Sequence, residues 1–126
     1  MHDLCDLRKL MIDLRRFEEA LREKASLSLN EALCLCQVHE GKRDPGTLSV
    51  ELELSPSRLS RILESLEKRK LITRTTSDND RRTVVVCLTD SGEALVAKLH
   101  GTSIPIPEHL IHAIESMRAE STQSGA

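Results

Sequence analysis

Residues 55–88, which read SPSRLSRILESLEKRKLITRTTSDNDRRTVVVCL, decide the fold. Ser55 is a good N-cap residue and Pro56 is favoured in a first helical turn, so a helix is expected over 55–70. Its apolar residues recur at helical spacing and form one buried face: Leu59, Ile62, Leu63 and Leu66. The sequence therefore predicts an amphipathic helix whose outer face is polar and basic.

The periodicity changes after this helix. Residues 72–76 (ITRTT) and 83–88 (TVVVCL) are rich in β-branched side chains, which favour strands. The polar residues 77–82 (SDNDRR) separate them and predict a turn. We therefore expect a β-hairpin with a charged tip directly after the helix.

Two further helices are expected before residue 55. Asp44 and Pro45 form another cap-plus-proline start, which predicts a short helix over 45–52. Residues 29–39 are apolar nearly all round, as in a helix that is buried on several sides. Two helices joined by a tight turn, with a basic outer face on the second, are typical of a helix-turn-helix, and the hairpin adds a wing.

Helices are also expected on both flanks of this segment, over 3–24, 89–100 and 107–119. The first has a leucine stripe at 3-4 spacing, formed by Leu7, Leu10, Leu14, Phe17 and Leu21, with Leu4 and Met11 beside it. A single small domain cannot cover this stripe, so an isologous homodimer is expected. The segment 101–107 (GTSIPIP) is expected to be non-helical and to separate the last two helices. Residues 121–126 are expected to form a frayed tail.

Together these elements predict a mainly α fold with a small β-wing. One domain is expected over 1–126, with a winged helix-turn-helix core over about 28–100. The helices at 3–24 and within 101–119 would serve dimerisation.

Charge distribution points to a nucleic-acid partner. The chain has a formal charge of −2, yet residues 55–82 carry eight basic and four acidic side chains. A basic segment on an acidic protein is a plausible phosphate-binding footprint. The chain has one Phe and no Tyr or Trp, which argues against a single-strand binder that stacks bases on aromatic rings.

The expected recognition helix supplies the candidate base contacts. Its N-terminal half carries Ser57, Arg58, Ser60 and Arg61 away from the leucine face. An arginine can bond bidentately to guanine and a serine can serve either base type, so these residues fit a major-groove reader of double-stranded DNA. Lys68 lies further along and should meet phosphate or solvent. Either Arg81 or Arg82 should enter the minor groove from the wing.

The sequence resembles the MarR (multiple-antibiotic-resistance regulator) family over residues about 28–100. The resemblance rests on 54–72 (LSPSRLSRILESLEKRKLI), Arg74, 78–82 (DNDRR) and 88–92 (LTDSG). It implies a homodimeric transcription regulator, a ligand-responsive repressor with a small-molecule effector. It also implies that Asp80 or Asp78 braces a wing arginine.

Two features depart from the family pattern. Glu53 stands where the family commonly has glycine in the turn, which predicts a slightly different turn. The break at 101–107 interrupts what is commonly one long helix, so the dimer interface is expected to be atypical.

Cysteines and histidines suggest only weak alternatives. Cys5 lies where hydroperoxide-sensing members of the family have a reactive cysteine, but the tyrosines that support it there are absent. Cys34 and Cys36 are interpreted as core residues. His109 and His112 have a spacing that can hold a metal, yet without a clear third ligand they are interpreted as exposed side chains, and no metal or cofactor is expected.

Other functional classes find little support in the sequence. No glycine-rich phosphate loop, nucleophile elbow or metal motif is present, so no enzyme activity is expected. No segment reads as a signal peptide or a membrane span, so a cytoplasmic protein is expected. The alternative from another class is a winged helix adaptor that binds proteins rather than DNA.

Overall fold

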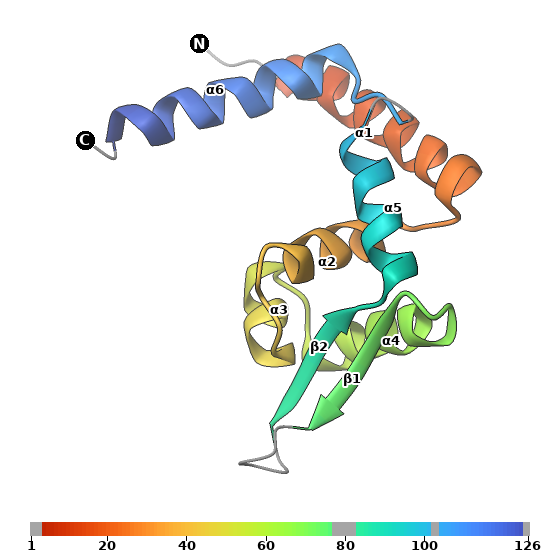
Figure 1. Ribbon diagram of the computed structural model, residues 1–126. Helices are drawn as coiled ribbons and strands as arrows, with labels where there is room; N and C mark the ends of the chain where they lie inside the picture. Colours follow the sequence, from red (N-terminus) through yellow and green to blue (C-terminus); the bar gives the residue numbers. More distant parts are fainter. Residues whose placement is uncertain (1–3, 77–82, 102–103, 125–126) are drawn as a thin grey trace. The chain divides into compact units, whose positions relative to one another are not determined.

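The computed structural model describes residues 4–76, 83–101 and 104–124, which form helices and one antiparallel two-stranded sheet (Figure 1). The elements are α1 (Leu4–Ala25), α2 (Leu29–His39), α3 (Pro45–Glu51), α4 (Pro56–Lys68), β1 (Ile72–Thr76), β2 (Val84–Leu88), α5 (Asp90–His100) and α6 (Glu108–Ser124). The expected mainly α fold with a β-wing is confirmed. One expectation was wrong: α6 continues through Ser124, where we expected a frayed tail from Ser121.

The chain folds as two compact units, which we describe separately. The helical unit comprises Met1–Ser26 and Ser103–Ala126 and contains α1 and α6. The winged unit comprises Leu27–Thr102 and contains α2 to α5 and both strands. No helix among the described residues is both long enough and apolar enough to span a membrane.

Helix α2 lies at the centre of the winged unit, which explains its apolar composition. It packs against α3, α4, α5 and β2. The side chains of Cys34 and Leu35 are fully buried, and Ala32 and Val38 are nearly so. The other elements bury their own leucine, isoleucine and valine faces in the same core: Leu48, Leu59, Leu63, Leu66, Ile72, Val86 and Val96.

Three helices of the winged unit end in the same kind of left-handed turn. The residue after the C-cap has a positive φ in each case: Gly41 (108°) after α2, Glu53 (51°) after α3 and Lys70 (59°) after α4. Two backbone hydrogen bonds close each turn in the Schellman pattern, as from Glu53 N–H to Val50 O and from Leu54 N–H to Ser49 O. The turn at Glu53 thus has the conformation that glycine favours, although a non-glycine residue occupies it.

The strands form the predicted hairpin. Ile72 pairs with Leu88 and Thr76 with Val84, so the described strands are in antiparallel register along their full length. The Val86 N–H donates to the Arg43 carbonyl (2.7 Å), which ties β2 to the loop before α3. Figure 1 shows the two strands extending away from the helices of the winged unit. The turn that joins them, residues 77–82, lies outside the described residues.

The start of α5 is held against the turn that follows α4. Thr89 caps α5 by accepting from the Gly92 N–H (3.1 Å), and its hydroxyl donates to the Lys70 carbonyl (2.7 Å). A Cβ atom at Gly92 would lie 2.1 Å from the Leu71 carbonyl oxygen. Only glycine allows this approach, which gives a physical reason for glycine in the LTDSG stretch.

The helical unit contains a buried carboxylate that the sequence pattern did not indicate. Asp13 of α1 is buried, and its carboxylate accepts from the His109 ring Nδ1 (2.9 Å) and from the His109 backbone N–H (3.3 Å). Asp13 therefore caps the first turn of α6 from another helix. His109 remains exposed, as expected, but it has this specific partner.

Much of the leucine stripe of α1 is exposed in the single chain. The exposed large apolar side chains of the helical unit are Leu4, Leu7, Met11, Leu14, Ile106, Ile111, Ile114 and Met117. They lie on α1, on α6 and on the segment before α6. Single exposed leucines are common on soluble proteins, but this many in one small unit suggests a surface that another molecule covers.

Candidate nucleic-acid interface

Helix α4 presents the predicted base-contacting residues to solvent. Its leucines Leu59, Leu63 and Leu66 are buried in the winged unit. The side chains on the outer face are all exposed: Ser57, Arg58, Ser60, Arg61 and Lys68. The predicted orientation of the helix is therefore confirmed, while the contacts of these residues with DNA stay a prediction.

The N-terminus of α4 is fixed by its own first turn. The Ser55 hydroxyl accepts from the Arg58 N–H (3.2 Å) and lies 3.3 Å from the Ser57 hydroxyl. Among the described residues, neither the Arg58 nor the Arg61 guanidinium has an ion-pair partner. Both guanidinium groups are exposed and form no ion pair with a carboxylate in the described part of the chain, so they are accessible to an external acceptor.

A salt bridge joins the C-terminal end of α4 to the wing. Arg74 Nη2 on β1 lies 2.9 Å from Glu67 Oε1. The hydrogen bond from Arg74 lowers the pKa of the Glu67 carboxyl, and the same bond raises the pKa of Arg74. Glu67 was not among the predicted site residues. In the sequence, Glu67 is part of the LEKRKLI stretch and Arg74 follows it, but this order does not indicate that the two side chains form a salt bridge.

A second carboxylate anchors α4 to α2. Glu31 accepts from the Ser28 N–H (2.9 Å) in a capping box, and its other oxygen accepts from the Ser65 hydroxyl of α4 (2.9 Å). Burial alone would raise the pKa of the Glu31 carboxyl. The hydrogen bonds from Ser28 and Ser65, with the positive charge of Arg69, outweigh burial and hold the pKa below its ordinary value.

The predicted wing-tip residues cannot be placed. Asp78, Asp80, Arg81 and Arg82 all lie outside the described residues. Their roles in groove binding and in bracing stay sequence predictions. The strands on either side are described: β1 ends at Thr76 and β2 begins at Val84.

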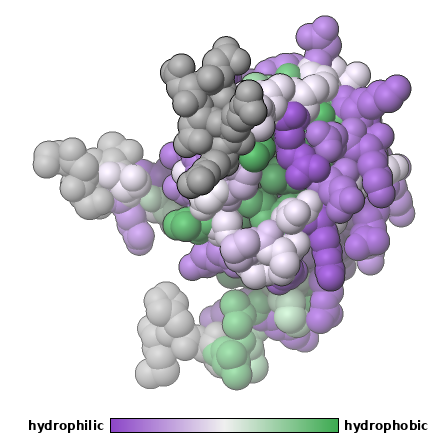
Figure 2. Space-filling view, turned by 90° about the horizontal axis from the view of Figure 1, so that it is seen from below, coloured by the Kyte–Doolittle hydropathy of each residue, from purple (hydrophilic) through white to green (hydrophobic). Residues whose placement is uncertain are grey.

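A cavity of about 380 Å³ lies between α3, α4 and the two strands. Its lining is largely apolar and includes Pro45, Val50, Leu59, Ser60, Arg74 and Val84. Figure 2 views the molecule from below, with the wing tip in grey, and shows apolar surface in the middle of this view with hydrophilic side chains around it. Ser60, on the outer face of α4, and Arg74, of the salt bridge with Glu67, both line this cavity.

Comparison with known families decides the class of this protein. A family model described as "Transcriptional regulator SarA/Rot" matches residues 16–99. The chain belongs to this family. The SarA/Rot chain is also 31% identical over 85 residues to YhbI of Bacillus subtilis (strain 168), an uncharacterized HTH-type transcriptional regulator. This match covers 67% of the SarA/Rot chain but only 55% of the relative.

Solved structures with the same fold are MarR-family regulators, as the sequence resemblance implied. A mutant MarR from E. coli aligns with a TM-score of 0.74 and 20% identity, covering 97% of this SarA/Rot chain and 98% of that one. The S. aureus MepR–DNA complex aligns with a TM-score of 0.63 and 22% identity, covering 94% of each chain. At these identities the comparison shows a shared fold.

The thiols of this SarA/Rot protein differ in environment. Cys5 is exposed on the first turn of α1, and a redox role for it stays a prediction. Burial raises the pKa of the fully buried Cys34 thiol to about 11, which agrees with its interpretation as a core residue. Cys36 was wrongly interpreted as core: it is only partly buried, and its sulfur lies 3.5 Å from the His100 ring.

Proposed function

We propose that this SarA/Rot protein is a homodimeric transcription regulator that reads double-stranded DNA in the cytoplasm. The exposed N-terminal half of α4 is the observation that supports this most strongly. There, Arg58 and Arg61 have no ion-pair partner among the described residues, while the opposite face of the helix is held in the core. A helix whose apolar face packs in the core and whose basic face is exposed can enter the major groove.

In this proposal α4 supplies base contacts and the wing supplies contacts to the backbone and the minor groove. Arg61 and Arg58 would donate to base edges, with Ser57 and Ser60 beside them. Lys68 would meet a phosphate. Arg81 or Arg82 would enter the minor groove, and Asp78 or Asp80 would brace one of them. The Glu67–Arg74 salt bridge joins β1 to α4, and so links the base of the wing to the proposed recognition helix.

The homodimer is the second part of the proposal. Leu7, Met11 and Leu14 are exposed along one stripe of α1, and Ile111 and Ile114 are exposed on α6. A second copy is the partner that fits, because two copies would present two recognition helices to successive major grooves. Leu7→Glu combined with Met11→Glu should shift the protein from dimer to monomer in light scattering. Val50→Glu, on the exposed side of α3, is the control and should stay dimeric.

A response to a small molecule is the third part. The cavity beside α4 is large enough for a small, largely apolar ligand, and its lining includes Ser60 and Arg74. A ligand there would compete with DNA for Ser60 and would disturb the salt bridge between Arg74 and Glu67. Both effects would weaken DNA binding, as expected of a repressor that releases its operator when a ligand binds. Ligands found by thermal shift should bind less well to Val50→Trp, whose larger side chain would occupy part of the cavity.

Selection from a pool of random duplexes, followed by gel shift, tests the DNA-reading function. The expected result is enrichment of one preferred sequence with two related half-sites. If no duplex is bound above the background of a random pool, the adaptor function is favoured instead. In that case, Arg58 and Arg61 would be expected to contact a protein partner instead of DNA.

A further inference from the structure

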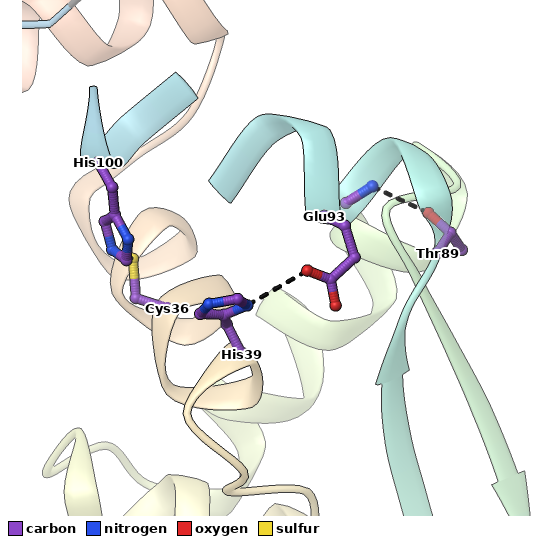
Figure 3. Close-up of polar contacts among 6 residues, drawn as sticks. Cys36, His39, Thr89, Glu93 and His100 are labelled. Atoms are coloured by element: carbon purple, nitrogen blue, oxygen red, sulfur yellow. Dashed lines mark hydrogen bonds and ion pairs between the residues drawn. The ribbon is translucent and has the colours of Figure 1, made fainter. Parts of the chain in front are cut away.

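Four side chains of metal-binding types gather where α2 lies beside α5 in the winged unit (Figure 3). Cys36 and His39 are one turn apart on α2. Glu93 and His100 are two turns apart on α5. The DNA-reading proposal uses none of these residues, and none of them lines the cavity beside α4.

The four side chains form two close pairs. Cys36 Sγ lies 3.5 Å from His100 Nε2, and His39 Nδ1 lies 3.2 Å from Glu93 Oε2. The rings of His39 and His100 bring the pairs together edge to face, with their centroids 6.0 Å apart. In the view of Figure 3, the His39 ring lies between Cys36 and Glu93, and the His100 ring lies next to the Cys36 sulfur.

These separations match the edges of a tetrahedral zinc site. Zinc binds a thiolate at about 2.3 Å and an imidazole nitrogen or carboxylate oxygen at about 2.0–2.1 Å. At tetrahedral angles these lengths place sulfur and nitrogen about 3.6 Å apart, and nitrogen and oxygen about 3.3 Å apart. Both pairs already have the spacing of two ligands on one ion.

To bind one ion, the two pairs must come closer together and the side chains must turn toward a common point. Two imidazoles on one tetrahedral ion would have centroids about 5 Å apart, so the rings must approach by about 1 Å. No three His, Cys, Asp or Glu side chains in the described ranges yet surround one point. His39, Glu93 and His100 are exposed, so their rotation is not restricted by the core.

We propose that Cys36, His39, Glu93 and His100 bind a transition metal ion of the zinc type, which cross-links α2 to α5. A thiolate with two imidazoles selects such ions over Mg²⁺ or Ca²⁺, which prefer oxygen ligands. Burial, and secondarily the charge of Glu40, raise the pKa of the Cys36 thiol, so a bound cation must displace the thiol proton as it forms the metal–sulfur bond.

Titration of the metal-free, reduced full-length chain with Co²⁺ tests this site. The expected result is one equivalent per chain with a thiolate-to-cobalt charge-transfer band, and its loss when Zn²⁺ displaces the cobalt. Cys36→Ser should abolish the band, and His100→Gln should weaken binding by at least about tenfold, the smallest cost typical of changes to residues that merely support a ligand. Circular dichroism checks that both variants remain folded.

Matched controls separate this site from the other thiols and histidines of the chain. Cys87→Ser and His112→Gln should bind Co²⁺ as the wild type does. The proposal is overturned if the wild type binds less than one equivalent, if the band is absent, or if it survives in Cys36→Ser. It is equally overturned if the control variants lose binding as strongly as His100→Gln.

Discussion

The guanidinium of Arg74 on β1 donates a hydrogen bond to the carboxylate of Glu67 on the last turn of α4, with 2.9 Å between Nη2 and Oε1. Both side chains are partly exposed, so solvent screens their attraction. The pair therefore adds little to global stability. Its geometric consequence is larger, because it links the base of the wing to the helix that we propose to read DNA.

Glu67→Gln should weaken duplex binding by up to about fivefold and leave the melting temperature nearly unchanged. Loss of a negative charge would by itself strengthen binding to DNA, so weaker binding points to the lost brace. Glu64→Gln is the control, since it removes the same charge one turn earlier without breaking this hydrogen bond. Fluorescence anisotropy measures both, and equal affinities for the two variants would contradict the bracing role.

Glu31 should make stability depend on pH in the acid range. Its pKa is lowered in the folded chain, so its carboxylate stabilises the fold above the ordinary glutamate pKa, and this contribution is lost as pH falls through the lowered value. At pH 7, Glu31→Gln should reduce the free energy of unfolding by about 1 kcal/mol, allowing for solvent screening. In urea titrations, the difference from wild type should begin to shrink as pH falls below the ordinary glutamate pKa of about 4.3, and should vanish once the folded-state carboxylate is protonated. A difference that persists at low pH would mean that the charge of Glu31 has no part in the effect.

Gly92→Ala should destabilise the winged unit by about 3 kcal/mol, because the new Cβ would collide with the Leu71 carbonyl and separate α5 from the turn after α4. Gly101→Ala is the matched control. There the nearest atom would be 3.5 Å from the new Cβ, an ordinary contact, so little loss is expected. Chemical denaturation that ranks the two substitutions equally would refute this close approach.

Most of the secondary structure could be predicted because its signals are local. Asp44, Ser55 and Thr89 each cap the helix that the sequence predicted to start there. The end of α6 was misjudged because residues 121–124 (STQS) are polar but contain no residue that stops a helix, and the first glycine comes at residue 125.

The contacts between elements could not be predicted, since they depend on how helices dock. Glu31 and Ser65 are 34 positions apart, and Asp13 and His109 are 96 apart. No periodicity connects them. The same reason explains Cys36, whose helix is apolar nearly all round, so that the sequence alone did not reveal a side chain facing His100.

The central claim is that α4 reads base edges, and the effect of Arg61→Ala on duplex binding tests it most directly. Arg61 is exposed on the face opposite the buried leucines, so its loss should scarcely affect stability. We expect a cost of about 1–3 kcal/mol per half-site and relaxed preference at one operator position, measured by anisotropy at two salt concentrations. Arg81→Ala or Arg82→Ala should weaken binding more evenly across sequences and flatten the salt dependence, while Arg16→Ala on α1 should change neither. If Arg61→Ala and both wing variants bind the selected duplex as tightly as the wild type, the DNA-reading assignment is wrong.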